Sequence, residues 1–314
     1  MVRGELLQAL YIPIMLAMMW IGGSQTALGV VVLWFEKSWQ AKAYGRIDKH
    51  LSRLIPWMAK SPLVRGIDLA SMLDGLALAS SRQGQYDRAR DLLVEAVRQS
   101  ERDPRFAKHP YVSIYYAHLA WVRLRLGNYD DAIVDAEHAI AILQDRLSVK
   151  YGLLKSLPVL LLSNVHLIKG ELTDAEITLE ETRKLLQLPV PPRYSDQSFV
   201  AFDVFVALTA ALLRAKQGRF EESTVELRKA IALAPGQRVN TSTLFLVNEI
   251  ASQFIDNELY SEAEVALSYA YPSAGNHPFS PDSQRLLAHF ERLLESTNRA
   301  DEVNDMRQWL RTAQ

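Results

Sequence analysis

Few residues in this sequence have the type and spacing that catalysis or metal binding requires. None of the 314 residues is cysteine, which excludes a cysteine nucleophile, a thiolate zinc site and an iron–sulfur cluster. His118, His138 and His166 fall at unrelated positions in the pattern of the chain. No Walker-type glycine loop, nucleophile elbow, HExxH motif or EF-hand loop occurs. We therefore expect no catalytic residue, no metal and no cofactor.

Adjacent carboxylates occur at 130–131 and 221–222, where an acid–base pair is one interpretation. Both pairs stand at the predicted start of a helix, where the helix dipole favours acidic side chains. The dipole explains these pairs without any catalytic role.

The charge of the chain is unevenly distributed. The net charge is −1, but residues 36–65 carry seven basic and two acidic side chains, a net of +5. The part that follows is therefore acidic. We call the basic segment at residues 36–65 the basic neck. The acidic charge of the residues after it argues against nucleic acid as a partner, because nucleic-acid binding needs a basic face on the folded domain.

A long uncharged stretch near the N-terminus predicts a membrane anchor. The thirty residues from Leu6 to Phe35 carry no charge, and roughly 20 apolar residues cross a bilayer. Tyr11 and Trp34 lie about 35 Å apart on a helix, which matches the distance between the two interfaces. We expect a single-pass helix within residues 1–35, spanning about residues 11–34.

Two other interpretations of this stretch stay open. A cleaved signal peptide has a shorter apolar region and a small-x-small cleavage site, whereas this run ends in Leu33, Trp34 and Phe35. A break at residues 22–25, which include Gly22 and Gly23, would instead produce a re-entrant hairpin.

The basic neck at residues 36–65 sets the expected orientation. Five basic residues follow the span within about 20 positions, whereas Arg3 is the basic side chain before it. The large domain should then lie on the cytoplasmic side. Residues 36–59 also form a predicted amphipathic helix that could contact anionic lipid or pack on the helix at 70–82. We expect it to pack there, close to the membrane.

Small residues within the predicted span suggest a helix-packing face. Gly22, Thr26 and Gly29 share one side of the helix, and the amide of Gln25 needs a partner at that depth. We interpret Gly22, Gln25, Thr26 and Gly29 as a possible contact with another transmembrane helix, although glycine is also common in membrane helices for other reasons.

The rest of the chain repeats itself. A glycine, an aromatic or leucine two residues later and a small residue three further on recur, with Glu258 in place of the last glycine. The copies are residues 84–89, 127–132, 170–175, 218–223 and 258–263. The first three are 43 residues apart. Such a period indicates stacked helix pairs, with the glycine ending the first helix and acidic residues opening the second.

Three further positions keep the same register in all five copies. Seven residues before the glycine position stand Ala77, Ala120, Ser163, Ala211 and Ala251. Seven residues after the motif stand Ala96, Ala139, Thr182, Ala230 and Ala270. Between these columns lie Leu93, Ala136, Leu179, Leu227 and Leu267. Small residues at fixed places allow two helices to approach closely.

This pattern resembles the tetratricopeptide repeat over about residues 66 to 310, with a longer period than usual. The resemblance implies an all-α, right-handed superhelical solenoid at residues 66–314, behind the transmembrane helix. It has five clear units and a degenerate sixth, in which Asn298 replaces the glycine and Val303 the alanine. The longer period and the replacement of glycine at Glu258 and Asn298 depart from the usual pattern of the family. They suggest a divergent, membrane-anchored bacterial type.

The resemblance also implies a function, because this family usually binds protein segments in the concave groove of its first helices. The groove positions of the family fall here on Asp74, Arg82, Trp121, Arg125, Asn164, Lys216 and Asn248. Trp121 flanked by Arg82 and Arg125 could hold a peptide with an acidic or aromatic anchor. Alternatively, Trp121 fills the space between helix pairs.

We therefore expect a scaffold that binds another protein and assembles or regulates a membrane complex. A close alternative is a permanent accessory subunit held through the transmembrane helix, with lipid contacts from the anchor and the basic neck. An enzyme or a sensor arm is the remaining alternative. An enzyme would need converging carboxylates, but the groove columns contain only Asp74 and Asp256, far apart in repeat order.

Overall fold

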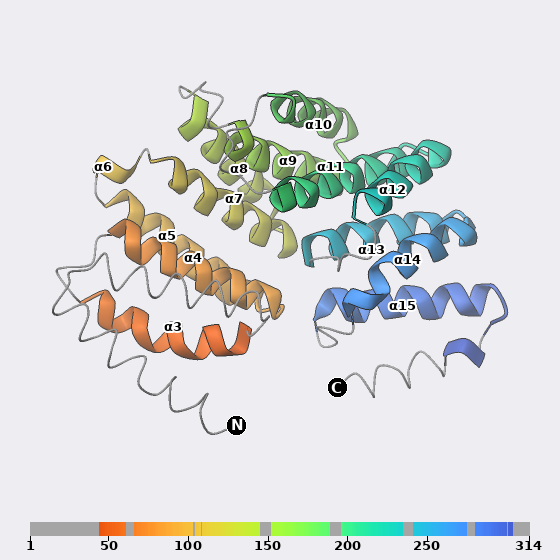
Figure 1. The fold of residues 1–314 in the computed structure, drawn as a ribbon, viewed down its shortest axis with the longest axis horizontal. Coiled ribbons are helices and arrows are strands. Elements are labelled where there is room, and N and C mark those ends of the chain that lie inside the picture. The colour runs from red at the N-terminus through yellow and green to blue at the C-terminus, as the bar shows by residue number, and fades with distance from the viewer. Residues whose placement is uncertain are drawn as a thin grey trace. The chain divides into compact units, whose positions relative to one another are not determined.

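The computed structural model describes nine stretches of the chain, residues 44–60, 66–102, 104–107, 109–144, 152–188, 196–234, 241–274, 280–299 and 301–303. Over these residues the protein is all helical, with thirteen helices and no strand (Figure 1). The chain divides after Val122 into two compact units, unit 1 before this residue and unit 2 after it.

Unit 1 holds the first helix pair. Its helices are α3 (Tyr44–Met58), α4 (Gly66–Arg82), α5 (Tyr86–Glu101), the short α6 (Pro104–Ala107) and most of α7 (Pro110–Arg125). Helices α4 and α5 pack on each other as one pair, and α3 packs on α4.

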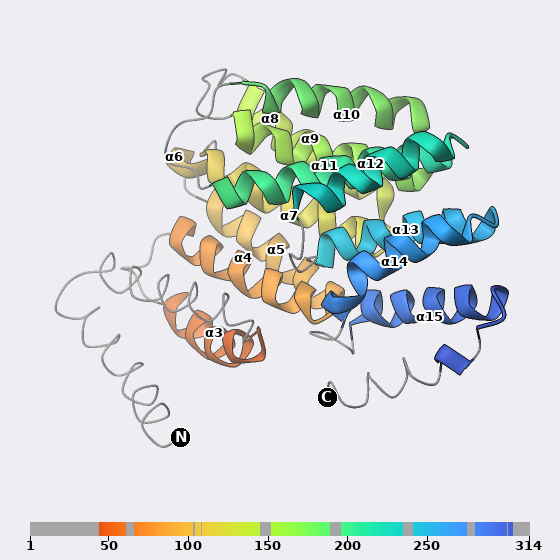
Figure 2. The ribbon, with the colours of Figure 1, turned by 45° about the vertical axis from the view of Figure 1, so that its right-hand side comes forward.

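Unit 2 holds the later pairs. Its helices after the end of α7 are α8 (Tyr129–Gln144), α9 (Gly152–Lys169), α10 (Leu172–Leu186), α11 (Asp196–Lys216), α12 (Phe220–Leu233), α13 (Thr241–Asp256), α14 (Tyr260–Ala274) and α15 (Pro281–Ser296). Within it α9 packs with α10, α11 with α12, and α13 with α14. The first helices α9, α11, α13 and α15 stack in that order (Figure 2).

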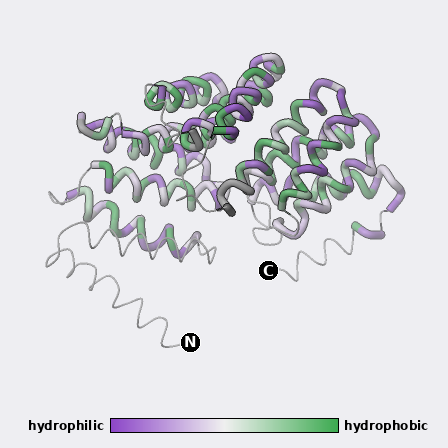
Figure 3. Tube along the Cα trace, turned by 45° about the horizontal axis from the view of Figure 1, so that its top comes forward, coloured by the Kyte–Doolittle hydropathy of each residue, from purple (hydrophilic) through white to green (hydrophobic). Residues whose placement is uncertain are grey.

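The predicted small-residue columns form the contacts between these helices. Three columns hold small residues: the position seven residues before the glycine, the end of the motif and the position seven residues after it. Every member of these columns, from Ala77 and Ala89 in the first repeat to Ala263 and Ala270 in the fifth, is fully buried. Apolar and polar residues interchange along the chain (Figure 3). Second helices such as α5 bury one stripe, whereas α11 is buried on all sides from Val204 to Leu213. The predicted helical repeat is confirmed.

The turn between the two helices of a repeat is built the same way each time. Gly84, Gly127, Gly170 and Gly218 have φ between 74° and 90°, a left-handed conformation that glycine adopts without a steric penalty. The next backbone N–H then reaches back to the carbonyl five residues earlier, as Gln85 does to Ser80 at 3.0 Å. This is the Schellman arrangement that ends a helix.

Two later turns adopt this conformation without glycine. Glu258 has φ 60° and Asn298 has φ 55°, with the same backbone hydrogen bonds from Leu259 and Arg299. Val303, after the last turn, is buried. The sixth unit therefore begins as the sequence predicts.

Helix α3 covers the predicted amphipathic segment from Tyr44 onward. Ile47, Leu51 and Met58 are buried in its contact with α4. Asp48 accepts a hydrogen bond of 2.9 Å from Arg88 of α5, and this bond lowers the pKa of Asp48. The apolar stripe of α3 is thus used within unit 1.

No helix among the described residues is both long enough and apolar enough to cross a bilayer. The predicted span at 11–34 lies outside the described residues, as do Gly22, Gln25, Thr26 and Gly29. The anchor therefore stays a prediction.

Replacing Glu258 with glycine should stabilise the protein. A left-handed conformation costs a residue with a Cβ about 1–2 kcal/mol, and the greater freedom of glycine in the unfolded chain cancels part of this gain. We expect the free energy of unfolding to rise by up to about 1 kcal/mol, measured by urea denaturation.

The matched control is Gly218→Ala. A Cβ at Gly218 would meet no atom within 4 Å, so a loss of stability there reports backbone strain rather than a steric clash. If Glu258→Gly lowered stability, the left-handed turn would not be the strained element.

Candidate protein-binding face

The predicted groove residues all lie on the first helices of their repeats, as the repeat register requires. They are Asp74 and Arg82 on α4, Trp121 and Arg125 on α7, Asn164 on α9, Lys216 on α11 and Asn248 on α13. Their surroundings differ between the two units.

In unit 1 two polar pairs join the neighbouring first helices α4 and α7. Asp74 Oδ1 and His118 Nδ1 lie 2.7 Å apart, with 14% and 22% of their side chains exposed. One turn earlier, the hydroxyls of Ser71 and Tyr115 are also 2.7 Å apart. Burial raises the pKa of Tyr115, so its hydroxyl stays protonated. We call these four residues the unit 1 ladder.

The unit 1 ladder stays within reach of solvent. Ser71 is exposed, Asp74 and His118 are half-buried, and Tyr111, one turn before Tyr115 on α7, is 57% exposed. The ladder therefore offers a carboxylate, an imidazole and the Ser71 hydroxyl beside an accessible aromatic ring, whereas Tyr115 itself is only 3% exposed. Such groups suit hydrogen bonds to a peptide backbone and its side chains.

The other two predicted residues of unit 1 are less available. Trp121 is only 7% exposed, so it packs mainly between helices. Burial lowers the pKa of Arg82, while the phenol groups of Tyr44 and Tyr86 act in the opposite direction. Arg82 therefore lies near the aromatic residues of α3 and α5.

In unit 2 Arg125 is already neutralised. Its two terminal nitrogens donate to the two carboxylate oxygens of Asp282 on α15, at 2.9 and 2.6 Å. Both side chains are more than nine-tenths buried, and the guanidinium lies 4.4 Å from the ring centroid of Phe245 on α13. A bidentate pair in such surroundings leaves Arg125 poorly placed to receive an acidic ligand.

The two predicted asparagines are also buried. Asn164 donates to the Leu160 carbonyl at 2.8 Å and accepts from Thr209 of α11 at 3.3 Å. Asn248 donates to the Asp282 carbonyl at 2.9 Å. Both have no exposed surface, so they join first helices to one another. Lys216, at the end of α11, is partly exposed.

Trp121 and the Arg125 side chain thus each expose little surface for the expected acidic or aromatic anchor. The pairing of Arg125 with Asp282 was missed from the sequence because the two residues are 157 positions apart and no local pattern connects them. His118 stands at no position shared by the other histidines, so its contact with Asp74 could not be predicted from the repeat pattern. It faces Asp74 because the two occupy nearly equivalent places in successive repeats.

One cluster of potential metal ligands occurs in unit 2. His166, Glu171 and Asp174 bring one ligand atom each within 4.8 Å of the others. However, Glu171 already accepts from His166 at 2.6 Å and pairs with Lys169 at 2.8 Å. A cation would have to displace the Lys169 ammonium, so we assign no metal to this turn.

Comparison with known proteins agrees with this geometry. Residues 68–145 match the family model of the tetratricopeptide repeat. Proteins built from these repeats are generally protein-binding scaffolds rather than catalysts. No curated protein matches the chain in sequence.

Two solved structures resemble this chain in fold. NprR in complex with its cognate peptide NprX has a TM-score of 0.65 at 12% identity, covering 97% of this chain and 82% of that one. The apo form of the quorum sensor NprR from B. thuringiensis has a TM-score of 0.55 at 12% identity, with coverages of 99% and 94%. At this identity the likeness concerns the fold alone.

Breaking the buried pair should destabilise unit 2 strongly. Asp282→Asn keeps the side-chain shape but leaves the Arg125 charge buried without its carboxylate, which typically costs about 3–5 kcal/mol. We expect this loss in the free energy of unfolding, measured by urea denaturation.

Asp256→Asn is the matched control, because Asp256 pairs with Arg292 at 2.7 Å while about half of each side chain is exposed. Exposed pairs contribute about 0–1 kcal/mol. Equal losses in the two variants would contradict the role we give to Arg125 and Asp282.

Proposed function

We propose that this chain is a non-enzymatic scaffold that binds a protein segment at the unit 1 ladder. The observation that carries this proposal is the contrast between the two units. In unit 1 Asp74, His118 and Tyr111 remain accessible, whereas in unit 2 Arg125, Asn164 and Asn248 are buried and bonded to neighbouring helices.

A peptide is the kind of ligand that this face suits. An extended segment exposes backbone N–H and C=O groups, and the ladder provides a carboxylate at Asp74 and an exposed hydroxyl group at Ser71. Tyr111 adds an exposed aromatic surface, a type enriched at protein interfaces. The solved NprR complex contains a peptide, which supports the same class of ligand here.

A photoreactive amino acid at Tyr111 tests the proposal. We expect it to crosslink a discrete partner protein in intact membranes of the source cells, identified by mass spectrometry. The matched control carries the same group at Val94 of α5, which is also exposed, at 45%, but lies on a second helix.

The partner identified at Tyr111 should also lose crosslinking when Asp74→Ala is added, because that change removes a ladder carboxylate. If the same proteins crosslinked equally at Tyr111 and Val94, this result would contradict the proposed binding face.

We propose further that residues 11–34 anchor the scaffold in a membrane with the repeats on the cytoplasmic side. The uncharged run and its basic flank support this arrangement. The full chain should stay with membranes after an alkaline carbonate wash, and deletion of residues 1–35 should release it.

The absence of cysteine makes the orientation directly measurable. A cysteine introduced at exposed Gln83 should react with an impermeant maleimide only after cells are broken open. Labelling of intact cells would place the repeats outside. A fixed stoichiometry with one membrane protein after detergent extraction would favour the accessory subunit over a scaffold with exchanging partners.

A further inference from the structure

The second helices of unit 2 expose an aliphatic residue at one shared position. It stands two residues after the buried small residue of each motif, on α8, α10, α12 and α14. These residues are Val134, Ile177, Val225 and Val265, with exposed fractions of 61%, 62%, 66% and 37%. We call them the outer row.

Packing of the repeat does not explain the outer row. The buried contacts of each pair come from the small columns, and the equivalent residue in the first repeat is Asp91, a charged side chain. Single exposed aliphatic residues are ordinary on protein surfaces. Four at one register position share one face of the repeats instead, because each repeat places that position on the same side.

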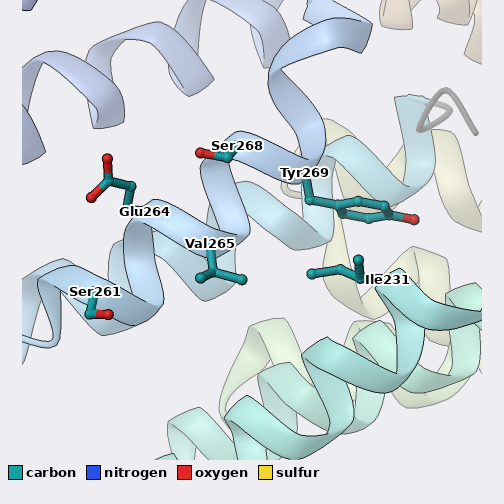
Figure 4. A pocket seen from close by; sticks show the side chains of 6 residues that line it. All are labelled: Ile231, Ser261, Glu264, Val265, Ser268 and Tyr269. Carbon is teal, nitrogen blue, oxygen red and sulfur yellow. The ribbon is translucent and has the colours of Figure 1, made fainter. Parts of the chain in front are cut away.

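The outer row ends in a hollow between α12 and α14. Val265 lines it with Ile231 and Tyr269, and Ser261, Glu264 and Ser268 complete the wall. Figure 4 shows the side chains of Val265, Ile231 and Tyr269 directed into the space between the two helices. The hollow has a volume of about 510 Å³. An apolar side chain from outside could enter it.

Acidic side chains border the outer row. Three residues before each member stands a carboxylate, at Asp131, Asp174, Glu222 and Glu262. Three residues after Val134 and Ile177 stand Glu137 and Glu180, which are exposed and form no ion pair within the described part of the chain. On α12 the corresponding residue is Arg228, so the border is most acidic over α8 and α10.

We infer that the outer row docks an amphipathic helix of another protein, with an aliphatic stripe and basic flanks. Side chains seven residues apart on a helix are separated by about 10.5 Å, close to the 8–10 Å between packed helices. Helices α12 and α14 contact each other, so a helix laid across them can meet Val225 and Val265 with side chains about two turns apart. Ile177 and Val134 continue the row at the same register position on α10 and α8. Its lysines or arginines would pair with the acidic border.

Other occupants fit this border poorly. A second copy of this chain would bring the same carboxylates against themselves, and an anionic bilayer would be repelled as well. The docking surface lies on second helices, so it is separate from the unit 1 ladder and does not depend on the function proposed there.

A designed helical peptide tests the inference on the full, detergent-solubilised chain. The probe has about 24 residues, leucine at every seventh position and lysines on both flanks, and its twin carries glutamate in place of each lysine. We expect fluorescence anisotropy to detect binding of the lysine peptide only, and high salt to weaken it.

The variant Ile177→Ser/Val225→Ser should weaken binding by at least about tenfold, since two aliphatic contacts are lost. The matched control is Val94→Ser, an exposed valine on α5 outside the outer row. It should bind as the parent does.

Three results would overturn the inference. The double variant could bind as tightly as the parent chain, or both peptides could bind alike, which would indicate simple adsorption. Sedimentation could also show that the chain self-associates and that the double variant abolishes this, in which case the occupant is a second copy. Crosslinking at Tyr111 is unaffected by any of these results, so the two proposals fail independently.

Discussion

Every helix pair in this protein depends on a close approach that only a small residue permits. The residues at the crossing points, such as Ala77 and Ala89, have no exposed surface. Where serine takes the place of alanine, its hydroxyl donates to the partner helix, as Ser163 does to the Ala175 carbonyl and Ser223 to that of Ala211, both at 2.8 Å. A buried hydroxyl is tolerated there because its hydrogen bond is satisfied.

The repeat could be predicted because its determinants are local. The positive φ of the turn, the small columns and the acidic start of the second helix each recur within a span of about 20 residues. Even the departures at Glu258 and Asn298 kept the same turn, since the backbone hydrogen bonds and buried neighbours fix it. The predicted span at residues 11–34 belongs to the part of the chain that the structure does not describe.

The surroundings of the predicted groove residues could be predicted only in part. Register correctly placed Asp74, Arg125 and Asn248 on first helices, but register cannot say whether another helix covers them. That depends on contacts between distant residues, such as Arg125 with Asp282 and Asn248 with the Asp282 carbonyl. The outer row could not be predicted either. An aliphatic residue on an amphipathic helix is expected to be buried, whereas these four are exposed.

The pair formed by Arg125 and Asp282 changes how unit 2 should fold. An open repeat array has contacts between neighbours alone, so it can nucleate anywhere and fray from either end. Here the end of α7 is joined to α15 across 157 residues. Closing that loop costs chain entropy. The contacts within each repeat do not offset this cost, so the contact between α7 and α15 becomes favourable only when the repeats between them have formed. Unit 2 should therefore fold slowly in its last step and unfold as one cooperative body rather than repeat by repeat.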